Sequence, residues 1–137
     1  MIERIVDVPR VRDGGPDDPD WHPLQHYFGL TAFGANVFVA RAAGQELVAA
    51  HDERSSGQEE LYLVTSGSAR FWLDGRERDV PAGHVVALPS PATRRRAVAL
   101  EPGTTLVAIG AQARPDGFPS TWDRGHFEGL PRARPPA

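Results

Sequence analysis

The sequence predicts an all-β fold, a sandwich or barrel of short antiparallel strands. Residues 60–65 and 68–73 divide into two faces at a period of two, which indicates strands. The faces are Glu60, Tyr62 and Val64 against Leu61, Leu63 and Thr65, and Ala69, Phe71 and Leu73 against Ser68, Arg70 and Trp72. Asp74-Gly75 follows directly. This dipeptide is a strong hairpin signal, because both central residues of a type I′ turn need a positive φ. Gly and Pro interrupt the chain at short intervals beyond it, as they do in sandwiches and barrels.

The segments before the first clear strand differ from the rest in composition. Residues 10–20 are turn formers and acids, so we expect an exposed loop there. Residues 21–28 are rich in aromatic side chains, and Pro23 suits the first turn of a short helix. We expect this helix to cover the barrel or to contact a partner subunit. Further strands are expected over residues 36–42, 46–51, 85–88, 94–100 and 104–109.

A chain of 137 residues has the length of one domain with one core. We expect an N-terminal arm and lid segment over residues 1–35, a β-barrel over residues 36–112, and a tail over residues 113–137 that packs on the barrel. Within the tail, Ser120 could cap a short helix with Asp123 three residues on. Trp122 and Phe127 would then pack against the barrel.

The composition excludes several classes of function. The formal net charge of -3 argues against a nucleic-acid partner. The chain has no cysteine, and all 15 of its basic residues are arginine, which excludes thiolate chemistry and a lysine Schiff base. The N-terminus is too charged for a signal peptide, and no apolar run is long enough to span a bilayer. We therefore expect a cytoplasmic protein without a membrane partner.

Two blocks of the sequence resemble the motifs of the cupin family. Glu60, then six residues, then Gly67 is similar to the end of the first cupin motif. Gly75, the Pro81-x-Gly83 turn and Pro89-Ser90-Pro91 are similar to the second, and the distance between the blocks is that of small cupins. The resemblance covers roughly residues 44–110. It implies an antiparallel jelly-roll barrel, a homodimer, and a ligand or metal held between inward-pointing residues.

The resemblance also implies where a metal would bind, and this sequence departs from that pattern. The usual ligands are two histidines spaced by one residue, a glutamate and a late histidine. The paired histidines would fall among residues 53–56, which are Glu53, Arg54, Ser55 and Ser56, and the late histidine near Arg94. Only Glu60 is in register. We therefore predict no cofactor and a degenerate metal motif.

Arginine in place of the late histidine leads to our first functional hypothesis. If Glu60 points into the barrel, Gln58 and Tyr62 do so too, because residues two apart share a strand face. An inward Arg94 would either pair with Glu60 or grip the carboxylate or phosphate of a small organic ligand. Three consecutive arginines, residues 94–96, cannot all face inward. The predicted ligand-binding residues are Glu60, Gln58, Arg94, Tyr62 and Phe38.

Two further hypotheses stay open. In one, His51, Gln58 and Glu60 hold a divalent metal (zinc, iron, manganese or nickel) for oxygenase, isomerase or cyclase chemistry, and His51 or Tyr62 acts as an acid or base. In the other, the barrel is filled, with Tyr62, Phe38 and Phe71 packed across it. On the strand that holds Phe71, Trp72 must face the opposite way, and the outward one of the two is compatible with a dimer contact.

Overall fold

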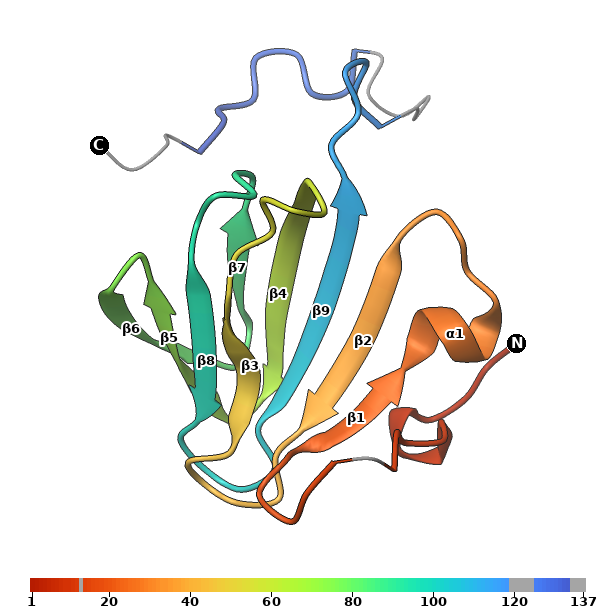
Figure 1. Ribbon diagram of the computed structural model, residues 1–137. Coiled ribbons are helices and arrows are strands. Elements are labelled where there is room, and N and C mark those ends of the chain that lie inside the picture. The colour runs from red at the N-terminus through yellow and green to blue at the C-terminus, as the bar shows by residue number, and fades with distance from the viewer. Residues whose placement is uncertain (13, 119–124, 134–137) are drawn as a thin grey trace.

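The computed structural model describes residues 1–12, 14–118 and 125–133. Its strands form two antiparallel sheets that face each other, and no strand pairing joins the sheets within the described residues (Figure 1). The first sheet contains, in spatial order, β1 (Asp20–Pro23), β2 (Gly34–Val39), β9 (Thr105–Gln112), β4 (Gln58–Ser66) and β7 (His84–Leu88). The second contains β3 (Glu46–His51), β8 (Arg95–Ala99), β5 (Ser68–Leu73) and β6 (Arg76–Pro81). This architecture confirms the predicted all-β fold.

The predicted hairpin joins β5 to β6. Leu73 pairs with Arg76, so Asp74 and Gly75 form a two-residue loop, and both have positive φ angles, 48° and 80°. These are the angles that a type I′ turn requires. Side chains alternate along β5 as predicted: Phe71 is fully buried between the sheets, while the ring of Trp72 faces outward, 5.0 Å below the guanidinium carbon of Arg96.

The N-terminal region contributes more to the sheet than the sequence predicts. Residues 20–23 form the edge strand β1, which pairs with β2, where we expected the end of a loop and the start of a helix. A four-residue edge strand is too short to show a clear period. The predicted helix is present as α1 (Leu24–Phe28) directly after Pro23, and it lies beside β2 (Figure 1). The only other helical turn among the described residues is the 3-10 segment η1 (Ile5–Asp7).

The core lies between the two sheets. Tyr62 and Phe71 lie across it with ring centroids 5.7 Å apart. Inward-facing residues of both sheets complete it, among them Leu47, Val64, Ala69, Leu88, Ala97 and Leu106. Tyr62 and Phe71 thus pack in the core as the filled-barrel hypothesis requires, whereas Phe38 lies only at its margin.

The tail after β9 is described only in part. Within residues 125–133, Phe127 and Leu130 are 52% and 62% exposed. Ser120, Trp122 and Asp123, on which the predicted tail helix rests, lie outside the described residues, so the packing of the tail stays a prediction, as does the homodimer. No helix in the described part of the chain is long and apolar enough to cross a membrane.

Gly67 connects β4 to β5 at a point where the backbone leaves no room for a side chain. A Cβ there would lie 2.8 Å from the Cα of Thr104 and 2.5 Å from its Oγ1, whereas a Cβ at Gly103 would meet nothing within 4 Å. Both glycines have positive φ angles, 68° and 80°. We predict that Gly103→Ala lowers the free energy of unfolding by about 1–2 kcal/mol and that Gly67→Ala costs roughly 1–3 kcal/mol more, because it adds a steric clash. Urea denaturation of both variants measures the difference, and equal losses would contradict it.

Candidate functional site

A cavity of about 720 Å³ lies beside the core and is lined by residues of β1, β2, β3, β4 and β9 and of the N-terminal segment. Its apolar wall comes from both sheets and includes Trp21, Phe38, Leu47, Val48 and Tyr62. Its polar wall includes His51, Glu53 and Glu60. The sequence therefore predicted four residues that line this cavity: Phe38, His51, Glu60 and Tyr62.

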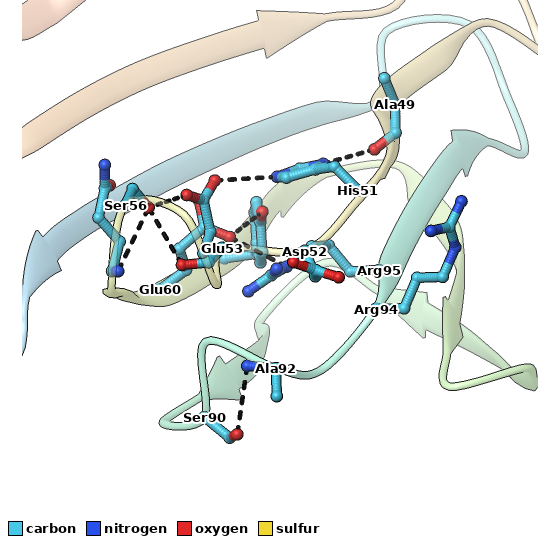
Figure 2. Close-up of polar contacts among 12 residues, drawn as sticks. Ala49, His51, Asp52, Glu53, Ser56, Glu60, Ser90, Ala92, Arg94 and Arg95 are labelled. Carbon is cyan, nitrogen blue, oxygen red and sulfur yellow. Dashed lines mark hydrogen bonds and ion pairs between the residues drawn. The ribbon is translucent and has the colours of Figure 1, made fainter.

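Three potential metal ligands converge in the polar wall (Figure 2). His51 ends β3, Glu53 follows it in the loop, and Glu60 lies on β4. One ligand atom from each side chain lies within 4.8 Å of the other two. All three side chains are partly buried, and His51 Nε2 lies 3.2 Å from a carboxylate oxygen of Glu53.

The hydrogen bonds of His51 determine which nitrogen faces this cluster. Nδ1 lies 2.6 Å from the carbonyl oxygen of Ala49, and because a carbonyl only accepts, Nδ1 must carry a proton. In the neutral imidazole Nε2 is then an acceptor, and it points at another acceptor, the Glu53 carboxylate. Only a proton on Nε2 or a cation between the two groups makes this contact favourable.

Glu60 is held in place by two side chains. Tyr62 donates its hydroxyl proton to Oε2 of Glu60 at 2.5 Å, and the Nε of Arg95 lies 3.2 Å from the same oxygen. Arg95 is completely buried, and none of its guanidinium nitrogens makes a well-aligned hydrogen bond to a described residue. The contact to Glu60 is therefore a buried ion pair that joins the two sheets. The second oxygen of Glu60 makes no hydrogen bond or ion pair with a described residue.

Tyr62 acts as a hydrogen-bond donor and not as a base. Burial, followed by the hydrogen bond to Glu60 and the negative charge of Glu60, raises the pKa of Tyr62 well above its ordinary value. The phenol therefore keeps its proton at every physiological pH. The predicted acid–base role of Tyr62 does not fit this arrangement, and we assign Tyr62 to the orientation of Glu60.

The inward arginine is Arg95, and the prediction of Arg94 was wrong. Arg94 precedes β8, is exposed, and points away from the cluster, whereas Arg95 points toward Glu60 (Figure 2). The backbone N–H of Arg94 donates to the side chain of Asp74, which fixes this orientation. Arg95 contacts Glu60 but is not among the residues that line the cavity. No arginine among the described residues is placed to grip a ligand there as the first hypothesis required.

Gln58 also differs from its predicted role. It points to the side of Glu60 that faces β9, where its amide oxygen lies over Gly110, and it does not line the cavity. A Cβ at Gly110 would come within 2.7 Å of this oxygen and 3.4 Å from Cγ of Glu60. The absence of a side chain at Gly110 thus makes room for Glu60. Glu53, which takes the place that we gave Gln58 in the cluster, falls in the window where the family resemblance puts the paired histidines.

The donor set of this cluster fits a divalent transition metal. An imidazole nitrogen and two carboxylate oxygens suit zinc, iron and manganese. A metal-bound histidine commonly donates its other N–H to a backbone carbonyl, as His51 does to Ala49. Ser56 donates to the carboxylate of Glu53, so both carboxylates are oriented by neighbouring hydroxyl groups.

Several solved structures have a fold similar to that of this chain. The chain is similar to a cupin-superfamily sugar phosphate isomerase from Silicibacter pomeroyi, with a TM-score of 0.65 and 18% identity over 82% of this chain and 76% of that one. A cupin protein from Bacteroides fragilis is similar with a TM-score of 0.64 and 18% identity, over 83% of this chain and 93% of that one. A cupin 2 conserved barrel domain protein from Salinispora arenicola has a TM-score of 0.60 and 21% identity, over 82% of this chain and 89% of that one. No family model and no curated protein matches the sequence. The chain therefore has the cupin fold that its motifs indicate.

Removal of Arg95 should destabilise the protein far more than removal of its neighbour. Arg95→Met leaves the carboxylate of Glu60 buried without its counter-charge, and breaking a buried pair in this way costs about 3–5 kcal/mol. Arg94→Met, one residue earlier and on the surface, should change stability by less than about 0.5 kcal/mol. The double variant Arg95→Met, Glu60→Leu should regain most of the loss, because it removes both charges. Urea denaturation of the three proteins checks the order, and an Arg95→Met variant as stable as Arg94→Met would refute the ion pair.

Proposed function

We propose that this cupin-fold chain binds a small organic molecule in the cavity, next to one divalent cation held by His51, Glu53 and Glu60. The observation that carries this proposal is the convergence of the three ligand atoms within 4.8 Å. They lie in the wall of a cavity large enough for a drug-sized molecule. The cation site uses two of the residues that the sequence indicated, with Glu53 in the place of Gln58.

The side chains around the cluster support this assignment in distinct ways. His51 presents Nε2 as an acceptor, since its Nδ1 is committed to Ala49. Glu60 presents one oxygen, since Tyr62 and Arg95 engage the other. A bound divalent cation would supply Lewis-acid polarisation of a ligand oxygen at this position. The apolar wall beside it would exclude water and orient the body of the ligand.

A second candidate is a metal-free binding cavity, and Arg95 is the observation that favours it. An arginine cannot ligate a cation and repels one, and its charge already offsets that of Glu60. In this case the contact between His51 and Glu53 is an ion pair with a protonated imidazole. The two candidates differ in whether the purified protein holds a metal.

The solved structures constrain the substrate only weakly. One of the similar proteins is named a sugar phosphate isomerase. No arginine among the described residues lines the cavity, and the sequence contains no lysine. The groups that usually bind a phosphate are therefore missing from the described wall, and we do not extend that substrate to this protein.

Metal titration distinguishes the two candidates. We predict that untagged, chelator-free protein binds one zinc, iron, manganese or nickel ion per chain. Glu53→Gln, Glu60→Gln and His51→Ala should each weaken this binding by more than the roughly 10–100-fold that loss of an outer-shell partner costs. Glu59→Gln is the matched control, because Glu59 neighbours Glu60 on β4 and is exposed. Elemental analysis and calorimetric titration provide the measurement. Absence of binding in the wild-type protein, or equal affinity in Glu60→Gln and Glu59→Gln, would favour the metal-free cavity.

A further inference from the structure

We infer that Arg95 competes with a metal ion for the carboxylate of Glu60, and that it thereby sets the affinity of the three-residue cluster for metal. This inference rests on the proposed cation site, and it names what regulates that site. It assigns to the inward arginine of β8 a function in addition to its contact between the two sheets.

The guanidinium of Arg95 has Glu60 as its single ion-pair partner among the described residues. Its Nε lies 3.2 Å from Oε2 of Glu60, and none of its three nitrogens makes a well-aligned hydrogen bond to a described residue. Buried N–H groups without acceptors are costly, and an apolar side chain would pack between the sheets at a lower cost. The property that distinguishes Arg95 from an apolar residue at this position is therefore its charge.

The position of this charge is fixed by the fold. The backbone of Arg95 pairs with His51 on one side and with Leu73 on the other, and its side chain is completely buried. An arginine stays protonated at physiological pH, and salt screens a buried charge much less than an exposed one. A metal ion bound to Glu60 would therefore lie close to a permanent and weakly screened positive charge.

The net charge of the cluster determines how strongly it attracts a metal ion. With His51 neutral, the carboxylates of Glu53 and Glu60 and the guanidinium of Arg95 leave one negative charge. Without the guanidinium, the same ligands would offer two negative charges to the ion. A neighbouring charge changes the affinity of a carboxylate for a proton about 10- to 1,000-fold, and a divalent ion carries twice the charge of a proton. Removal of the charge of Arg95 should therefore tighten metal binding at least about tenfold.

Substitutions that separate the charge of Arg95 from its contacts test this inference. Arg95→Gln removes the charge and keeps an amide that can donate to Glu60, and we expect it to bind zinc at least about tenfold more tightly than the wild-type protein. Tyr62→Phe should not tighten zinc binding, because it removes a hydrogen bond to the same oxygen and no charge. Arg94→Gln, at the exposed neighbouring position, should leave zinc binding unchanged. Calorimetric titration of the wild-type protein and the three variants provides the measurement.

The sign of the effect separates competition from a purely structural role of Arg95. A structural role predicts weaker zinc binding in Arg95→Gln, because a misplaced Glu60 is a poorer ligand. Equal or weaker binding in a folded Arg95→Gln protein would overturn the inference, as would a gain of the same size in Tyr62→Phe. If Arg95→Gln does not fold without metal, zinc should restore its circular dichroism spectrum, because the ion supplies the missing counter-charge and its binding favours the folded state. A variant that zinc does not refold would contradict the competition.

The outcome is separable from that of the wild-type metal titration. Zinc binding by Arg95→Gln but not by the wild-type protein would refute the cation site proposed for the wild-type protein and support the competition. Zinc binding of equal strength by both proteins would do the reverse. Absence of zinc binding in both proteins would overturn the site and the competition together.

Discussion

The ion pair between Arg95 and Glu60 is the constraint on which the cavity end of the sandwich depends. The two residues come from different sheets, on β8 and β4, and the guanidinium is completely buried. Burying either charge without the other would destabilise the protein by about 3–5 kcal/mol. The pair therefore constrains how β8 and β4 face each other at these two residues. It also orients the site, because Tyr62 and Arg95 both engage one oxygen of Glu60, and a carboxylate oxygen of Glu60 lies within 4.8 Å of ligand atoms of His51 and Glu53.

Much of the fold follows from local sequence, because its signals lie within a few residues of one another. The strand over residues 68–73 and the turn at Asp74-Gly75 need only a period of two and two residues that tolerate positive φ. β1 was not predicted, because its four residues form a strand only by pairing with β2, a contact that local periodicity does not encode. Fold recognition succeeded through Glu60, Gly67 and the later turn residues. These are positions at which the backbone path restricts the choice of residue, as the contact of Gly67 with Thr104 illustrates.

The site was predicted less completely, because its residues depend on loop conformation and strand register. Glu60 was proposed from its place in the family motif and His51 from its place at the end of an apolar strand. Glu53 lies in a loop, and its direction depends on the backbone bond from its N–H to Pro91, which the sequence does not reveal. The choice of Arg94 over Arg95 was an error of one residue, and on a strand one residue reverses the face. The start of β8 at Arg95 and the register shifts between β3 and β8 set that face.

The same pairing bears directly on the proposed cation site. An arginine beside three metal ligands would ordinarily oppose metal binding. Here the Nε of Arg95 contacts the oxygen of Glu60 that Tyr62 also engages, and Arg95 is not among the residues that line the cavity. The arginine thereby helps to orient Glu60. A cation at the proposed site would share this carboxylate with Arg95, so the metal titration measures how strongly the charge of the arginine opposes binding.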